Sequence, residues 1–338
     1  MFGFFKRKPQ PPQSDPLHDW IASYTRREVV IPQGDISRIE VLEIGGDYET
    51  LTAIPDEIGR LSALKVLSLD KNSITSLPES IGNLKELKVL ILKDMPLSSI
   101  PDCVFDLPLE YLVIGRTDMS ELPAAIGRLK KLRILDLYTS RFTTLPEEIG
   151  ECGELRVLNL FNSAILSLPE SIGNLSNLEN LDMHLCAIQS LPESFARLSR
   201  LISLNLQNAK SFERLPENIG EMSNLEAIDI ESTQVDTLPA SVCALSKLKV
   251  LNLSGTQITE LPPCTENLTS LKLLKLLRCR VTQLSAGMER EDLVIVSKRV
   301  TTPLTNIVAD DPRLEIELTS VLEKPLFLDR YLESVGIK

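Results

Sequence analysis

A repeat of about 23 residues constrains the fold of this chain more than any other feature of its sequence. Two blocks, from Leu107 and Leu198, are 22 and 24 residues long, a longer unit (Ile36 to Arg60) precedes the array, and a partial one from Leu268 closes it. Seven blocks of 23 residues begin at Leu61, Leu84, Leu129, Cys152, Leu175, Met222 and Leu245. A chain of 338 residues built in this way grows by repetition rather than as two or three globular domains.

The middle of each block has the alternation of apolar and polar residues that a half-buried strand requires, as in Val157-Leu158-Asn159-Leu160-Phe161. Ten prolines each follow a Leu or Ile at the same place in the block, and acidic residues cluster just after most of them. A missing N–H is tolerated at the start of a helix, and carboxylates are favourable there. Each block therefore predicts one strand and one short helix or helical turn.

One such unit cannot bury its own apolar face, so the blocks must stack with strand beside strand and helical segment beside helical segment. A helix is wider than the roughly 4.8 Å between paired strands. The stack should therefore curve with its strands on the inside. The fold class that we expect is an α/β solenoid with a parallel sheet on its concave side.

The spacing LxxLxxLxLxx(N/T/S/C)x(I/L)xxLPxxIGx, which runs from residue 36 to about 288, resembles the leucine-rich repeat. It is most similar to the 23-residue type with LP and IG pairs that occurs in Ras-suppressor-like proteins, plant intracellular Ras-group proteins and bacterial effectors. The resemblance implies a curved horseshoe with short helices or helical turns on its convex side. It also implies a module for protein–protein interaction.

The repeats divide the chain into four parts. Residues 1–15 are predicted to be a flexible leader, because they are rich in proline, glutamine and bases. Residues 16–35 are predicted to be an N-terminal helical cap, with Leu17, Trp20 and Ile21 on one stripe of a helix from Pro16 to Val29. The alternative for this helix is a docking element for a partner.

The array itself, residues 36–288, is predicted to hold about 11 repeats. Beyond Leu284 the period is lost. Residues 289–338 are predicted to form a C-terminal cap, with a strand at Leu293 to Val300 and a helix or helix pair from Leu314 to Val335. About fifty residues suffice for a cap but are few for an independent catalytic domain.

Charge and targeting signals narrow the partners and the compartment. The formal net charge is −11, which argues against a bulk electrostatic hold on nucleic acid or anionic lipid. Six cysteines in a chain of this length do not predict a disulfide scaffold. The first eight residues, MFGFFKRK, contain too few consecutive apolar residues for a secretory signal. The sequence also has no uninterrupted apolar run of about 18 residues, which a membrane-spanning helix would need. We expect a cytoplasmic protein without a membrane span.

The inventory of reactive side chains predicts no enzyme. The chain has only two histidines and no Gly-rich phosphate loop of the G-x-x-x-x-G-K-S/T type. His184 and Cys186 are two residues apart, but in this repeat the tenth place faces the concave surface and the twelfth turns into the core. Cys152, Cys186 and Cys279 occupy core or turn places, where cysteine acts as a small apolar residue. We expect no catalytic residues, no cofactor and no metal.

The candidate site is the concave surface, because its columns gather aromatic residues in a chain that has few. The tenth place of three consecutive blocks holds a ring, and Asp or Asn residues form a column beside these rings at the eighth place. Aromatic anchors rimmed by charges are typical of interface hot spots, whereas the alternative is that the rings only stack on one another. The predicted partner-binding residues are Tyr111, Arg116, Asp136, Tyr138, Arg141, Phe161, Asp182, His184 and Leu185.

The sequence therefore favours a non-enzymatic scaffold that binds a partner protein in its concave groove and that is a monomer, with signalling as its expected context. The resemblance implies a small GTPase or a phosphatase subunit as the class of partner. The alternative is a bacterial effector whose repeats recognise a substrate while the tail takes part in ubiquitin transfer. A third interpretation is structural assembly through the ends of the array.

Overall fold

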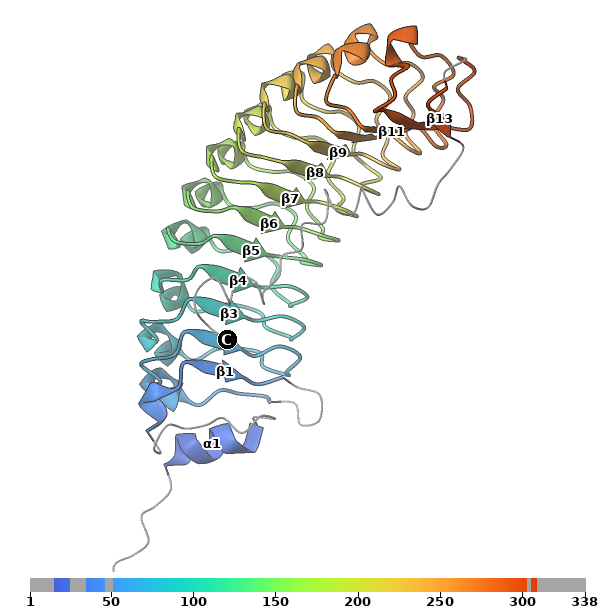
Figure 1. The fold of residues 1–338 in the computed structure, drawn as a ribbon. Helices are drawn as coiled ribbons and strands as arrows, with labels where there is room; N and C mark the ends of the chain where they lie inside the picture. The colour runs from blue at the N-terminus through green and yellow to red at the C-terminus, as the bar shows by residue number, and fades with distance from the viewer. Residues whose placement is uncertain (1–14, 25–34, 46–50, 303–304, 309–338) are drawn as a thin grey trace, which may run out of the picture.

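The computed structural model describes residues 15–24, 35–45, 51–302 and 305–308. These residues form a curved solenoid in which one continuous sheet runs along one side and short helices follow one another along the other (Figure 1). The predicted fold class, a parallel-stranded solenoid with the strands on the concave side, is thus confirmed.

Thirteen strands form the sheet among the described residues, and they lie in sequence order with every neighbouring pair parallel. All but the last are three residues long, so each block contributes only the centre of the predicted run. The strands are β1 Val41–Glu43, β2 Val66–Ser68, β3 Val89–Ile91, β4 Tyr111–Val113, β5 Ile134–Asp136, β6 Val157–Asn159, β7 Asn180–Asp182, β8 Ser203–Asn205, β9 Ala227–Asp229, β10 Val250–Asn252, β11 Leu273–Lys275, β12 Val294–Val296 and β13 Ile307–Val308.

The convex side is built of single 3-10 turns rather than α-helices. Each of the ten recurrent prolines opens such a turn, because its carbonyl accepts the N–H of the residue three places on, as Pro146 does from Ile149 at 3.1 Å. The 3-10 helices are η2 Ile36–Arg38, η3 Asp56–Arg60, η4 Glu79–Asn83, η5 Asp102–Asp106, η6 Ala124–Arg128, η7 Glu147–Glu151, η8 Glu170–Asn174, η9 Glu193–Arg197, η10 Ile219–Glu221, η11 Ala240–Ala244, η12 Pro263–Asn267 and η13 Ala286–Met288.

The core lies between the sheet and the convex turns and runs the length of the array. The middle residue of every three-residue strand is a buried Leu or Ile, and these residues are paired in register from Leu42 to Ile295. Ile149 from a convex turn and Phe142 from the return segment are also fully buried. Cys152, Cys186 and Cys279 belong to the same core, as predicted.

The N-terminal end of the array carries the one α-helix of the described residues, α1 (Pro16–Tyr24). Its Leu17 and Ile21 are buried in the main core. The Asp15 side chain accepts the Leu17 N–H at 3.0 Å and pairs with Arg60 of η3, with Asp15 Oδ2 and Arg60 Nη2 2.6 Å apart. The helix is therefore fixed to the first repeats. The rest of the predicted helix to Val29 and the leader at 1–14 lie outside the described residues.

At the other end the ladder continues past residue 288. The predicted strand at 293–300 is present as β12, and β13 pairs with it in parallel, so the sheet extends into the segment that was assigned to the C-terminal cap. The predicted helical region at 314–335 lies outside the described residues. A disulfide between Cys243 and Cys264, which the sequence analysis did not anticipate, joins η11 to η12.

Candidate functional site

The backbone that follows each strand is a repeated left-handed turn. The eleventh residue has a positive φ in the blocks of β2 to β11, and in the blocks of β2 to β10 its N–H donates to the carbonyl of the tenth residue in the next block, as from Leu185 to Gln207 at 2.9 Å. This extends the ladder of the sheet beyond the three strand residues. The residues with positive φ are Lys71, Asp94, Arg116, Thr139, Asn162, Leu185, Asn208, Ser232, Gly255 and Arg278.

Six side chains at the eighth place, at the ends of β5 to β10, cap their own chain. In each case the Oδ1 atom accepts the N–H of the tenth residue, at distances from 2.8 to 3.1 Å. We call these six residues the capping ladder; they are Asp136, Asn159, Asp182, Asn205, Asp229 and Asn252. The ladder fixes the direction of the tenth side chain, which is where the sequence analysis placed its ring anchors.

The capping role changes the interpretation of two predicted binding residues. Asp136 and Asp182 hold the N–H groups of Tyr138 and His184, so one oxygen of each carboxylate already has an internal partner. Burial raises the pKa of Asp136 above its usual range, although the hydrogen bond from Tyr138 opposes this shift. Contact of these two residues with a partner protein stays a prediction.

Both the hydroxyl and the ring of Tyr138 contact other residues of the chain. Its hydroxyl donates to Asp94 Oδ2 at 3.0 Å, and burial together with the Asp94 charge raises the pKa of this phenol. Its ring covers Gly115, where a Cβ atom would lie only 2.1 Å from Tyr138 Cε1. Tyr138 is half-buried and contacts its own chain through its hydroxyl and its ring, so it is a less free anchor than the sequence suggested.

Phe161 and His184 form the ring contact at the centre of the concave face. Their ring centroids are 5.3 Å apart and the planes are inclined by 58°. Both residues are half-buried, and their N–H groups are held by Asn159 and Asp182 of the capping ladder. A contact between neighbouring rings is what the alternative interpretation of these residues describes, but part of each ring still faces outward, so their contact with a partner stays a prediction.

Tyr111 does not belong with these rings. Its place in the repeat predicts a further accessible ring, but Tyr111 is only 4% exposed. It lies in β4 between Val89 of β3 and Ile134 of β5, and these residues pack in one apolar cluster on the concave side. Burial raises the pKa of its phenol. The prediction that Tyr111 is an accessible anchor is therefore wrong, because large apolar neighbours on both strands enclose it.

The two predicted arginines are exposed and form ion pairs with carboxylates of the preceding block. Arg116 Nη1 lies 3.2 Å from Asp94 Oδ1, and Arg141 Nη2 lies 2.9 Å from Asp118 Oδ1. Asp94 therefore accepts contacts from both Arg116 and Tyr138. Exposed pairs of this kind contribute little to stability, so both guanidinium groups can exchange their partners.

Two leucines in the middle of the array are unusually exposed. Leu185 follows His184 and is 42% exposed, as the sequence analysis proposed, and Leu166, on the return segment after β6, is 47% exposed. Sequence reasoning missed Leu166. The sequence does indicate that Leu166 is unusual, because the corresponding places of the neighbouring blocks hold the polar residues Thr143 and Gln189. We call Phe161, His184 and Leu185 the central patch.

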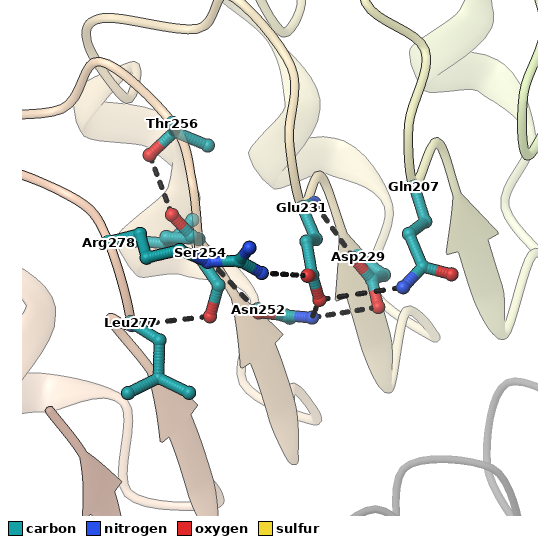
Figure 2. A network of polar contacts seen from close by, with 9 residues as sticks. Gln207, Asp229, Glu231, Asn252, Ser254, Thr256, Leu277 and Arg278 are labelled. Atoms are coloured by element: carbon teal, nitrogen blue, oxygen red, sulfur yellow. Dashed lines mark hydrogen bonds and ion pairs between the residues drawn. The ribbon is translucent and has the colours of Figure 1, made fainter. Parts of the chain in front are cut away.

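A second polar region, which sequence reasoning also missed, surrounds Asp229 toward the C-terminal end (Figure 2). Asn252 donates to Asp229 Oδ2 and to Glu231 Oε2, both at 3.0 Å, and Arg278 Nη2 lies 3.1 Å from Glu231 Oε1. Asp229 is 2% exposed, and burial raises its pKa to about 6. These carboxylates are satisfied by neighbouring side chains, so the network holds the concave surface together.

The described part of the chain offers no group of three or more metal-ligating side chains. No helix within the described ranges is long and apolar enough to cross a membrane.

Comparison with known proteins identifies the repeats in two segments of the sequence. Residues 204–291 match the family described as leucine-rich repeat region, and residues 63–84 match the family described as leucine rich repeat. Comparison with curated protein sequences finds no match.

Solved structures with the same fold include proteins from several kingdoms. An internalin (inlF) of Listeria monocytogenes is 21% identical with a TM-score of 0.60, and the match covers 82% of this chain and 87% of that one. A chain of the Drosophila Toll–Spätzle complex is 20% identical with a TM-score of 0.63, over 80% of this chain and 37% of that one.

A chain of the Arabidopsis complex of the receptor kinase HAESA with the peptide hormone IDA and the co-receptor SERK1 is 20% identical with a TM-score of 0.55. This match covers 77% of the chain and 43% of the Arabidopsis chain. The chain thus spans less than half of the two receptor-complex chains but most of the internalin. The repeat families that match the sequence and the curved parallel sheet together show that the chain is a leucine-rich repeat protein.

Proposed function

We propose that the chain is a non-enzymatic scaffold that binds a partner protein on its concave face, at the central patch of Phe161, His184 and Leu185. The observation that carries this proposal is the exposed side chain of Leu185. The other described residues with positive φ at this turn are polar, charged or glycine. Leucine is unfavourable in a left-handed conformation, and exposure of its side chain to water does not stabilise the fold. An apolar side chain at this place is therefore explained best by contact with another molecule.

The surroundings of Leu185 support a protein as the partner. The adjacent rings of Phe161 and His184 offer apolar area that can be removed from water, and the capping ladder holds them rigidly. The exposed Arg116 and Arg141 provide charges at the rim that can fix the orientation of a partner. Rigid anchors lose little conformational freedom on binding.

The comparisons support the same general role. Two of the similar structures are complexes with protein or peptide partners: Toll with Spätzle, and HAESA with the peptide hormone IDA and the co-receptor SERK1. The narrower proposal of a small GTPase or a phosphatase subunit as partner, in cytoplasmic signalling, depends on the resemblance to the 23-residue LP-and-IG type. The effector alternative depends on the tail beyond residue 308, which lies outside the described residues.

The test is affinity capture from a lysate with quantitative mass spectrometry, comparing the wild-type chain with a Phe161→Ala/His184→Ala double variant. The matched control is Val308→Ala, because Val308 is also a partly exposed apolar residue (37%) but lies at the far end of the sheet. The proposal expects proteins that are retained by the wild type and the control and lost by the double variant. Equal capture by all three would remove the central patch as the binding site.

A further inference from the structure

The convex turns of successive repeats touch at one recurrent place, and this place leaves no room for a side chain. A Cβ atom on Gly173 of η8 would lie 2.3 Å from the carbonyl oxygen of Ser194 in η9. A Cβ atom on Gly220 of η10 would lie 2.2 Å from the carbonyl oxygen of Ser241 in η11. At these steps a glycine of one turn therefore packs directly against a serine of the next.

The step from η11 to η12 replaces both partners with cysteine. Cys243 takes the place of the glycine and Cys264 takes the place of the serine, and a disulfide joins them. The Cα atoms are 5.8 Å apart, which is an ordinary separation for this bond. A covalent link thus stands where the neighbouring steps have only a close contact.

The other cysteines differ from this pair in their surroundings. Cys152, Cys186 and Cys279 are buried, their thiols donate to backbone carbonyls of the core, and burial raises their pKa. Cys103 is half-buried and stands opposite Gly82 at the corresponding step, so it has no thiol to join. Cys243 and Cys264 are both partly exposed.

We propose that Cys243 and Cys264 form a reversible thiol–disulfide site on the convex face, with a small or protein dithiol as its reductant. In the reducing direction a thiolate of the dithiol attacks one sulfur of the pair, and the S–S bond breaks as a mixed disulfide forms. The second thiol of the reductant then attacks the reductant's own sulfur in the mixed disulfide and releases the cysteine that is still bound there. Two electrons and two protons pass to Cys243 and Cys264, and the reductant leaves as a disulfide.

The bond closes a segment that includes β10 and Asn252, and Asn252 holds Asp229 and Glu231 on the concave face. In a solenoid each repeat contacts only its neighbours, so opening the bond should loosen the structure locally. The site therefore couples the redox state of the surroundings to the rigidity of the last complete repeats. The centre of the array at β5 to β7 should not respond.

The first experiment counts free thiols on the full chain after incubation with oxidised glutathione. Unfolding in guanidinium chloride with iodoacetamide but without reductant should give four adducts by intact mass, from the four cysteines outside the pair. Pretreatment with the dithiol dithiothreitol under native conditions should give six. Six adducts in both samples, or four in both, would overturn the proposal. A Cys103→Ala control should lose one adduct from each count and keep the difference of two.

The second experiment measures amide hydrogen exchange on the oxidised and reduced wild-type chain. We expect exchange to rise about tenfold or more at residues 240–267 on reduction and to stay unchanged at residues 134–182. A Cys243→Ala/Cys264→Ala variant should match the reduced wild type at 240–267 in both redox states. Equal exchange at 240–267 in the oxidised and reduced wild type would show that the bond does not control the rigidity of these repeats.

Discussion

The concave face is built in two different ways in β2–β4 and in β5–β10, although the repeat is the same. In β3 and β4 the eighth residues are Ile91 and Val113, which have no acceptor for a backbone N–H, and they pack with Val66, Val89 and Tyr111 in a buried apolar cluster. In β5 to β10 the eighth residue is Asp or Asn and caps its own chain. The first region thus contributes to stability through packing, and the second organises its surface through hydrogen bonds.

This difference shows where a binding surface can lie on such a sheet. A concave residue that is enclosed by large neighbours, such as Tyr111, has little area left to offer a partner. A residue that is held by a hydrogen-bonded turn, such as Phe161 or Leu185, keeps part of its apolar surface outside. Variants that disturb the packed region or the hydrogen-bonded region should therefore differ in their effects.

The largest effect is expected at Asp229 of the capping ladder. Its pKa of about 6 lies above the ordinary value near 4, so between these values the folded chain binds more protons than the unfolded chain. The free energy of unfolding should therefore fall as the pH rises from about 4 to about 6. Asp229→Asn keeps a capping oxygen for the Glu231 N–H and removes the titrating group, but its amide NH2 faces the Asn252 donor, so the gain in the free energy of unfolding at pH 7 should be at most on the order of 2 to 3 kcal/mol.

Urea unfolding between pH 4 and pH 7.5 checks this prediction. The fall in stability over this range should become smaller in Asp229→Asn, although the nearby Glu231, Lys275 and Arg278 remain. Asp136→Asn is the matched control, because the pKa of Asp136 is also raised but its side chain is only half-buried, so its gain should be smaller. An undiminished fall in the stability of Asp229→Asn between pH 4 and pH 6 would show that Asp229 does not titrate as expected.

A pair of identical truncations compares the two regions directly. Val89 and Val157 occupy the same place in their blocks, but Val89 is fully buried and Val157 is half-buried. Val89→Ala should lower the free energy of unfolding by about 2 kcal/mol, because two methyl groups leave a packed cluster. Val157→Ala should cost less than about 1 kcal/mol. Urea denaturation of both variants measures these losses in the free energy of unfolding. Equal losses would show that the two regions do not differ in packing.

A smaller effect is expected where the two regions meet, at Tyr138. Tyr138→Phe removes the hydrogen bond to Asp94 and keeps the ring over Gly115. The expected loss is about 1 kcal/mol, since a net hydrogen bond contributes roughly that amount. A double-mutant cycle with Asp94→Ala should show that the two losses are not additive. Full additivity would mean that the hydroxyl and the carboxylate do not interact.

The sequence predicted the fold well because the features that define it are local and repeated. The Leu or Ile at the centre of each three-residue strand and the Pro that opens ten of the convex turns recur at fixed places, so the stacking and the concave side followed from them. Tyr111 shows the limit, because periodicity assigns a residue to a face but does not say how its lateral neighbours Val89 and Ile134 enclose it. The capping by Asp136 and the disulfide at Cys243 depend on atoms brought together only by the fold.

The most direct test of the account is one variant, Leu185→Asn, measured for stability and for partner capture together. Asparagine tolerates the left-handed turn better than leucine, so the melting temperature should stay the same or rise slightly. Partner capture should fall about tenfold or more, because the exposed apolar side chain at the centre of the site is gone. An unchanged melting temperature with undiminished capture would contradict the claim that the central patch binds the partner.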